Sequence, residues 1–298
     1  MMTIVLIIIT LVYVKIWAHT PTDTLVYDKS GESYIIQYEG RNGSPISIAY
    51  EPPTKILPNI KCEATHTARE HSYQFKYSVE NTASSKQSLR VFMVSFGEAT
   101  DTRGNSGGKW LSKRKMEARN GTLQYVNLWM WTDKDGLRPS DVSNEFALVS
   151  TSLPGINNAY CQGKTSMLAY PDKGPNIEVK TQLVRLNTFP QNFVTKKTIS
   201  PVMPPASVGV FLDTLISYKH QALALKWIDN EGVANSLDQK LENAKQKLAK
   251  RDSVAARNIL EAFVNEVEAQ KDKHLTSEAY ALLKFNAEYL IDRLPQKK

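Results

Sequence analysis

The sequence predicts an all-β plus all-α protein of two domains, an antiparallel β-sandwich followed by a small antiparallel helical bundle. Three observations predict it. From residue 24 to about residue 199, apolar and polar residues alternate with a period of two, and polar turns separate the runs. After Phe211 the apolar residues recur every three or four positions, the spacing of amphipathic helices. Between the two patterns lies a proline-rich stretch, residues 201–205, PVMPP.

The clearest strand signal lies at residues 72–80, where four apolar residues alternate with polar ones. These apolar residues are Tyr73, Phe75, Tyr77 and Val79. One apolar face and one polar face are typical of an antiparallel sheet that covers a core on one side. Further strands are predicted at residues 33–38, 46–50, 60–64, 89–96, 123–131, 145–150, 165–169 and 177–186. About eight to ten short strands without helical periodicity favour a sandwich or a barrel.

The prolines set the expected domain boundaries. Proline lacks the backbone N–H and fixes φ, so residues 201–205 are not expected to continue a central strand. We therefore expect a signal peptide at residues 1–18, a sandwich domain at 19–200, a Pro-rich linker at 201–210 and a helical domain at 211–298.

Four helices are predicted in the C-terminal region. The first runs from Phe211 to about Trp227, and Asn235 is the candidate N-cap of the second. Thr276 is the candidate cap of the fourth helix. The apolar stripes of the second and third helices are Leu237, Leu241, Ala244 and Leu248, and Ala256, Leu260, Phe263 and Val267. Short connections predict that the helices are antiparallel neighbours.

Residues 235–291 resemble the FIMAH domain, a small helical module at the C-terminus of many secreted bacterial proteins. The core Leu260-Glu261-Ala262-Phe263 and the Leu275-Thr276 cap before Ala279 carry much of the resemblance. It implies a bacterial, exported protein. It implies neither a reaction nor a ligand, because the module has no catalytic motif. The preceding region resembles uncharacterised sandwich regions through residues 77–81 and 153–156.

The N-terminus predicts export. Residues 3–14, TIVLIIITLVYV, form an apolar run that is shorter than the roughly 18 residues needed to span a bilayer. A small residue suited to cleavage, Ala18, follows this run. We expect a secreted or periplasmic protein, without a stable transmembrane anchor if the signal is cleaved. A retained N-terminal anchor is the alternative.

The net charge of +7 is uneven along the chain. From Phe211 onward there are 14 basic and 13 acidic residues, which leaves 23 basic and 17 acidic residues before it. Such an excess can attract anionic glycans, lipopolysaccharide or nucleic acid, although a soluble lysine-rich surface explains it as well. No basic block is longer than Lys113-Arg114-Lys115, so no specific nucleic-acid partner is expected.

The sequence offers few candidate site residues. An even number of cysteines in an exported protein predicts a disulfide between Cys62 and Cys161, and two buried free thiols are the alternative. Asp133 and Asp135 precede Gly136, which is typical of a hairpin turn. An EF-hand loop requires glycine at its sixth position, whereas Gly136 is at the fourth, so only a weak calcium site stays open there. No other cofactor is expected.

The tryptophans are the candidate ligand-binding residues. Trp129 and Trp131 lie two residues apart and therefore on one face of a strand. If exposed, they would form a platform for sugar rings; if buried, they belong to the sandwich core. Trp110 follows Gly107 and Gly108, and we expect it in an exposed loop.

The catalytic motifs expected of the main hydrolase classes are not found. The chain has no Gly-x-Ser-x-Gly, the nucleophile motif of α/β-hydrolases. The leading hypothesis is a non-catalytic envelope or extracellular protein whose sandwich binds a protein or a glycan. The alternative is a secreted hydrolase with an unrecognised site in the sandwich loops, because triad members and carboxylate pairs can be far apart in a sequence.

Overall fold

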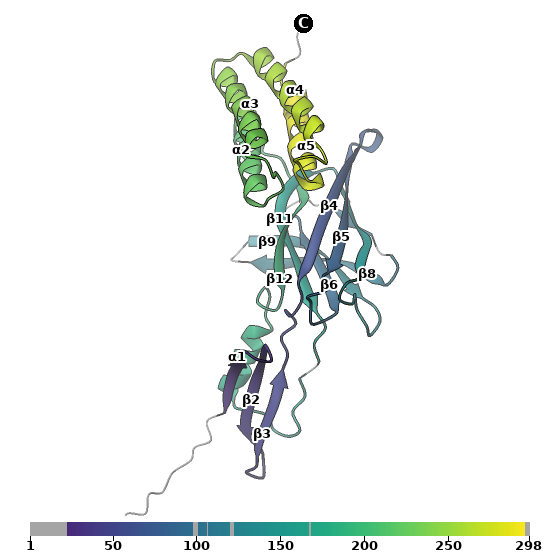
Figure 1. The fold of residues 1–298 in the computed structure, drawn as a ribbon, viewed down its shortest axis with the longest axis vertical. Coiled ribbons are helices and arrows are strands. Elements are labelled where there is room, and N and C mark those ends of the chain that lie inside the picture. Colours follow the sequence, from purple (N-terminus) through teal and green to yellow (C-terminus); the bar gives the residue numbers. More distant parts are fainter. Residues whose placement is uncertain (1–22, 98–100, 106, 120–121, 167, 296–298) are drawn as a thin grey trace, which may run out of the picture. The chain divides into compact units, whose positions relative to one another are not determined.

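A computed structural model describes residues 23–97, 101–105, 107–119, 122–166 and 168–295 (Figure 1). The predicted signal peptide, residues 1–18, lies outside these residues. Within the described part of the chain, no helix is both long enough and apolar enough to cross a membrane.

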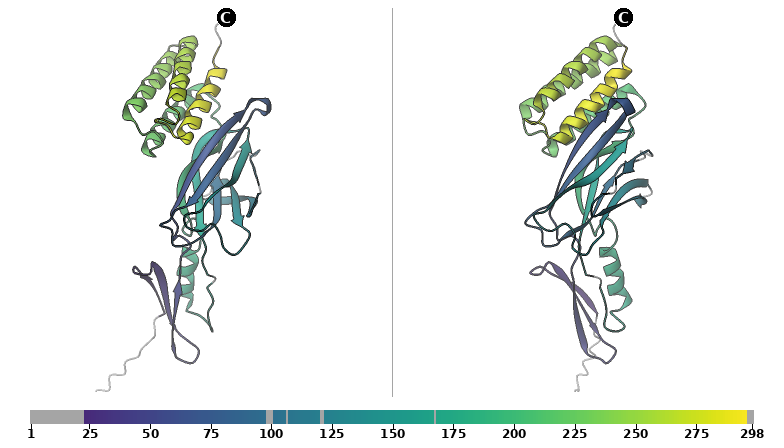
Figure 2. Two further views of the ribbon diagram at one scale, coloured as in Figure 1. Left: turned by 45° about the vertical axis from the view of Figure 1, so that its right-hand side comes forward. Right: turned by 90° about the vertical axis from the view of Figure 1, so that its right-hand side faces the viewer.

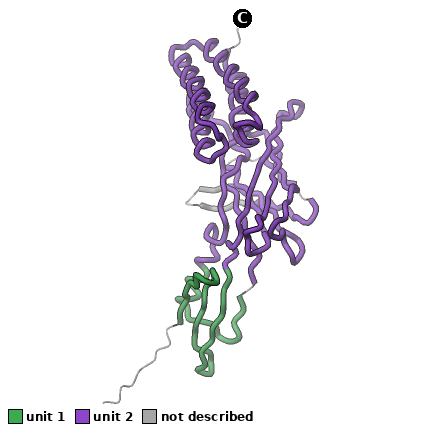
Figure 3. Tube along the Cα trace, viewed as in Figure 1, with its two compact units in different colours: residues 1–51, 167–184 green, residues 52–166, 185–298 purple. Residues whose placement is uncertain are grey.

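The chain divides into two compact units, coloured separately in Figure 3. Of the described residues, the smaller unit combines 23–51 with 168–184. Its strands β1 (Thr24–Asp28), β2 (Ser33–Glu39) and β3 (Pro45–Tyr50) form an antiparallel sheet in the order β1-β2-β3. Helix α1 (Ile177–Leu186) packs Val179 and Leu183 against the sheet residues Ile36, Tyr38 and Tyr50.

Helix α1 corrects the strand predicted at residues 177–186. Its sequence, IEVKTQLVRL, fits both patterns in part, because apolar residues recur at spacings of two and of four. The helix buries Val179 and Leu183 together, and the Asn176 side chain accepts a hydrogen bond from the Val179 N–H at 3.0 Å. The strand predicted at residues 165–169 is not formed by the four of these residues that the structure describes.

The larger unit contains a sandwich of two antiparallel sheets, which confirms the predicted fold class. One sheet has the order β4-β5-β10-β7 and the other the order β12-β11-β6-β9-β8. The first consists of β4 (Pro58–Thr67), β5 (Ser72–Asn81), β10 (Val142–Ser150) and β7 (Arg103–Gly104). The second consists of β12 (Val194–Val202), β11 (Leu153–Gly163), β6 (Leu89–Ser95), β9 (Thr122–Trp131) and β8 (Trp110–Arg119).

Aromatic side chains fill the space between the two sheets. Phe92 stacks on Trp129 with ring centroids 5.4 Å apart, and Phe146 lies 4.8 Å from Phe92. Tyr77 contacts the same rings from β5. The period-two alternation of the strands places these residues on the inner faces, where they are almost completely buried.

Four helices follow the sandwich: α2 (Val208–Ala224), α3 (Glu231–Ala249), α4 (Ser253–Gln270) and α5 (Ser277–Arg293). Each begins after a residue whose side chain accepts a hydrogen bond from a backbone N–H of the first turn; these caps are Ser207, Asn230, Asp252 and Thr276. The Thr276 cap was predicted. The predicted cap Asn235 was wrong: it lies inside α3, which begins earlier because Asn230 accepts from the Val233 N–H.

The connection between the sandwich and the helices is shorter than the predicted linker at residues 201–210. Strand β12 continues through Pro201 and Val202, and α2 begins at Val208. Pro201 is tolerated because β12 is an edge strand that pairs only with β11, where Pro154 lies opposite.

Helix α5 packs directly against the sandwich, on β4, β11 and β12 (Figure 2). The Phe285 ring lies 5.4 Å from the Tyr73 ring, and one continuous cluster of buried apolar residues extends from the inter-sheet core into the helices. Two buried hydrogen bonds cross this junction. The Cys62 N–H donates to the Glu278 carboxylate at 2.6 Å, and the Asn286 amide donates to the Pro154 carbonyl at 2.8 Å.

Candidate functional site

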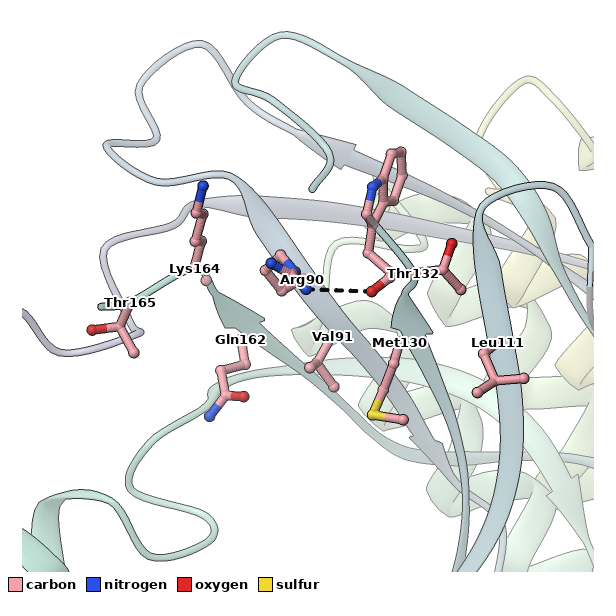
Figure 4. Close-up of a pocket in the computed structure, with 10 residues that line it drawn as sticks. Arg90, Val91, Leu111, Met130, Thr132, Gln162, Lys164 and Thr165 are labelled. Atoms are coloured by element: carbon pink, nitrogen blue, oxygen red, sulfur yellow. Dashed lines mark hydrogen bonds between the residues drawn. The ribbon is translucent and has the colours of Figure 1, made fainter. Parts of the chain in front are cut away.

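A groove crosses four strands on the outer face of the five-stranded sheet (Figure 4). Gln162 of β11 pairs with Val91 of β6, Val91 with Met130 of β9, and Met130 with Leu111 of β8. Residues paired across strands share a face of the sheet, so these four side chains form one row. The groove that they line, together with the rim residues described below, has a volume of about 560 Å³, and we call it the sheet groove.

The floor of the sheet groove is apolar. Val91 and Met130 are half-buried, and Leu111 is 48% exposed. Their side chains point outward because their neighbours Phe92 and Trp129 point into the core. The next outward-facing positions, Met93 and Leu128, are buried, and Phe189 and Phe193 pack against the cluster that they form. The sheet groove is therefore an open part of an otherwise covered apolar face.

The rim of the sheet groove lies at the ends of the strands and is largely polar. The rim residues are Arg90, Trp131, Thr132, Gly163, Lys164 and Thr165. The Arg90 guanidinium donates to the carbonyls of Lys134 and Trp131, each at 3.4 Å. The Lys164 side chain points away from the apolar floor in Figure 4, and Arg90 alternates with Val91 along β6, so neither cation faces the floor of the groove.

The charge of the surrounding sandwich has the same sign. Residues 52–166 and 185–210 contain 18 basic and 10 acidic residues, whereas the helices from residue 211 onward are nearly balanced. The positive charge of the chain is thus concentrated in the segments that build the sandwich.

The three candidate tryptophans do not form an exposed platform. Trp129 is completely buried and donates its indole N–H to the Asn105 carbonyl at 2.9 Å. Trp110 is 2% exposed and donates to the Ser143 hydroxyl at 3.2 Å, so the expectation of an exposed loop residue was wrong. The reason is that Trp110 begins β8 opposite Trp131, and its ring packs at 86° against that of Trp131. Trp131 is half-buried at the end of β9, and its ring lies on the Trp129 side of the sheet, beside the sheet groove.

Asp133 and Asp135 stabilise the turn after β9. The Asp133 carboxylate accepts hydrogen bonds from the Asp135 N–H and from the Trp131 indole, and it lies 3.6 Å from the Lys109 ammonium. The Asp135 N–H is the main cause that lowers the pKa of Asp133. Asp135 itself forms an ion pair with Arg138 at 3.2 Å. Among the described residues, no three His, Cys, Asp or Glu side chains are placed to hold a metal ion.

Cys62 and Cys161 are buried free thiols, so the predicted disulfide is not formed in this structure. They lie on β4 and β11, in different sheets, and the Cys62 thiol is hydrogen-bonded to Tyr77. Tyr77 in turn donates to the Ile199 carbonyl at 3.0 Å. Burial raises the pKa of both thiols, which makes them poor nucleophiles.

A second cavity, of about 580 Å³, lies where the α2–α3 and α4–α5 connections meet β4. His274 and Asp229 line it, with 2.8 Å between the ring Nδ1 and the carboxylate. A nucleophilic site also requires a hydroxyl within about 3.2 Å of the base. The two nearby hydroxyls have other hydrogen bonds, because Thr276 caps α5 and Ser277 donates to Glu278 at 3.3 Å.

Comparison with known proteins identifies the helical part. The model of the FIMAH domain matches residues 219–292, from the end of α2 through α5, which confirms the resemblance and extends it towards the N-terminus. The first solved structure found is described as an uncharacterized protein from Nocardia farcinica with an immunoglobulin-like fold. It is 8% identical, with a TM-score of 0.27, and the match covers 50% of this chain and 97% of that one. No curated protein matches the chain.

The sequence did not predict the sheet groove, although β9 contained a signal. Its residues 125–131, YVNLWMW, are largely apolar on both faces, whereas a strand with one face in water alternates with polar residues. Val126, Leu128 and Met130 form the second apolar row. Such a row indicates an outer face that is covered or makes contacts.

Proposed function

We propose that the chain is an exported, non-catalytic protein that binds a protein of the cell envelope or exterior through its sandwich. The sheet groove is the observation that carries this proposal. Its apolar floor, Val91, Met130 and Leu111, leaves apolar area that a protein partner could cover.

A protein partner is favoured over a glycan by the surroundings of Trp131. Sugar rings stack on an open aromatic face, and Trp131 is the one tryptophan beside the sheet groove among the residues that the structure describes. The Lys109 ammonium lies 5.3 Å from the centre of the Trp131 ring, over its face, and Trp110 packs against it edge-on. The apolar side chains of Leu111, Met130 and Val91 offer contacts that a protein side chain uses better than a sugar does.

Export is supported by two features. One is the apolar run of residues 3–14, and the other is the FIMAH match, since the sequence resemblance associates this module with secreted bacterial proteins. An exported protein meets its partners outside the cytoplasm, so the partner is a protein of the envelope or the exterior.

Site-specific photo-crosslinking tests the proposal. A benzophenone amino acid replaces Leu111 in one variant and Val149 in another; Val149 is 37% exposed on β10, in the other sheet. In the exporting cell we expect discrete crosslinked proteins from position 111 and none of them from position 149. The same products from both positions, or none from position 111, would overturn the proposal. A glycan array with residues 19–298 tests the rival ligand class.

The hydrolase alternative has one observation in its favour, the Asp229–His274 pair in the second cavity. Replacing His274 with Ala in the purified chain tests it. A hydrolytic activity that His274→Ala abolishes, without a change in melting temperature, would favour this alternative over a binding protein.

A further inference from the structure

We infer that the sheet groove takes a pair of aromatic side chains from its partner protein, on a segment that carries an acidic residue beside β8. This inference rests on the proposed function and adds the chemistry of the bound segment.

The chain itself covers the other half of this outer sheet face with aromatic rings. In the segment between α1 and β12, Phe189 and Phe193 pack over the buried, outward-facing residues Met93, Leu128 and Tyr160. The Phe189 ring lies 4.8 Å from the Tyr160 ring and 5.5 Å from the Phe193 ring, edge-on in both cases. Two neighbouring rings thus cover this half of the face.

The sheet groove continues the covered half. Val91 and Met130 of its floor pack against the same apolar cluster as the two phenylalanines. Gln162, at the β11 end of the groove, donates its side-chain amide to the Asn192 carbonyl of the covering segment at 3.3 Å. Aromatic rings placed in the groove therefore extend a cover that the chain has already begun.

The composition of the floor favours aromatic side chains. Met130 lies at its centre, between Val91 of β6 and Leu111 of β8 (Figure 4). A methionine sulfur makes favourable contacts with aromatic rings. Strands β6 and β8 are two strand spacings apart, about 10 Å. Two rings with centroids about 4.5–7 Å apart fit across this width.

The charge beside the groove favours an acidic neighbour of the aromatic pair. Lys113 and Lys115 follow Leu111 along β8 in steps of two, so the three side chains lie on the same side of the sheet. Arg114, between them, faces the inner side, where its guanidinium lies 4.6 Å from the centre of the Tyr125 ring. Both lysines are exposed, and within the described part of the chain neither forms an ion pair. A carboxylate of the partner beside Leu111 meets complementary charge there.

A second copy of the chain fits the groove less well than a different protein. Among the large apolar side chains that are exposed in the described residues, Tyr27 is the one aromatic. Its ring neighbour Tyr34, at 5.1 Å, is half-buried in the smaller unit. A second copy therefore does not offer an exposed aromatic pair, and a different protein is the better occupant.

The experiment selects binders of residues 19–298 from a phage-displayed library of random linear decapeptides. We expect enrichment of sequences with two aromatic residues and an Asp or Glu beside them. Fluorescence anisotropy then measures the affinity of the best peptide. Replacement of either aromatic residue of that peptide with Ala should weaken binding about tenfold or more.

Variants of the chain locate the site. Leu111→Asp should weaken the best peptide about tenfold or more, because it places a carboxylate in the apolar strip. Lys113→Glu should weaken it about threefold in low salt, and a peptide whose acidic residue is changed to Lys should bind this variant better than the unchanged chain. Lys76→Glu, an exposed lysine on β5 in the other sheet, is the matched control and should change neither affinity. Equal melting temperatures show that the variants are folded.

Three results would overturn the inference: selected peptides without an aromatic preference, aromatic peptides that bind Leu111→Asp as tightly as the unchanged chain, or a dimer in sedimentation velocity that Leu111→Asp dissociates. The last would make a second copy the occupant. An unchanged affinity of Lys113→Glu would remove the acidic neighbour.

The crosslinking experiment separates this inference from the proposed function. If position 111 crosslinks a protein in the exporting cell while the peptides show no aromatic preference, the inference fails and the proposed function stands. If neither is observed, both fail.

Discussion

The sandwich and the helical region differ in how they balance their charges. The helical region, from residue 211 onward, contains 14 basic and 13 acidic residues. Many of them form ion pairs, such as Lys245 with Asp213 at 2.7 Å and Lys240 with Glu266 at 2.6 Å. The sandwich segments have 18 basic and 10 acidic residues, and they also form the sheet groove. The region with a recognisable family is thus internally balanced, and the region with unmatched charge is where we place the ligand.

The two regions nevertheless share one core. The buried cluster extends from Trp129 between the sheets to Leu290 in α5 without interruption. A module that matches a family on its own is therefore an integral part of this folded unit. Variants of each region can test whether either region depends on the other for its stability.

Removal of the helices is expected to have the largest effect. Truncation after Ser207 removes α5, which exposes Tyr73 and the other apolar residues that α5 covers, and it replaces the hydrogen bond from Cys62 N–H to Glu278 by one to water. The main cost is the apolar surface returned to water, at about 25 cal/mol per Å². We expect residues 23–207 to lack a cooperative thermal transition by circular dichroism, in contrast to residues 23–298.

A truncated chain that melts within a few degrees of the longer one would show that the helical region is an appendage. The contact between the helices and the sandwich would then contribute little to the free energy of unfolding.

The second largest effect is expected within the sandwich, from two tryptophans on the same strand. Trp129→Ala should lower the free energy of unfolding by about 3–5 kcal/mol, because it leaves a cavity among Phe92, Phe146 and Tyr77. Trp131→Ala should cost about 1 kcal/mol and should change crosslinking from position 111 instead. Urea titrations of both variants make the comparison.

Equal losses of stability in these two variants would contradict the separation of core and groove on β9. A larger loss from Trp131→Ala would mean that the rim of the sheet groove is part of the structural core.

The sequence predicted the secondary structure best where one pattern had no competitor. The predicted apolar stripes are confirmed, because residues at spacings of three and four are buried together in α3, α4 and α5. The predicted N-cap Thr276 is confirmed as well. Residues 177–186 fitted two patterns, and only the packing of Val179 and Leu183 on the small sheet decides for a helix. Local pattern alone cannot contain that information.

The site residues were harder to predict because exposure depends on pairing between distant strands. Trp110 follows two glycines, which is typical of a loop, yet its place opposite Trp131 buries it. The sheet groove arises from four strands separated in sequence, and Arg90 and Lys164 become neighbours only when β6 pairs with β11. No spacing within one segment indicates such a site.

The smallest effect is expected on stability at high pH, from Tyr73 at the junction between the sandwich and α5. Burial raises the pKa of Tyr73 to about 12, and Glu288 and Asp292 of α5 add to the shift. An unfolded tyrosine titrates near pH 10, so between about pH 10 and 12 the unfolded chain loses this proton first. Tyr73 therefore lowers the stability of the fold as the pH rises through that window. Tyr73→Phe removes this contribution while keeping the ring that contacts Phe285.

Chemical denaturation at pH 9, 10, 11 and 12 measures the difference between Tyr73→Phe and the unchanged chain. We expect the Phe variant to lose less stability between pH 10 and 12, and the two curves to run parallel below pH 9. Phe211→Leu is a useful control, since it alters packing within the helical region without removing a titrating group. Parallel curves for Tyr73→Phe over the whole range would mean that Tyr73 ionises as freely in the folded chain as in water. The contact between Tyr73 and α5 would then be open to solvent, and the two regions would be less firmly joined than their common core indicates.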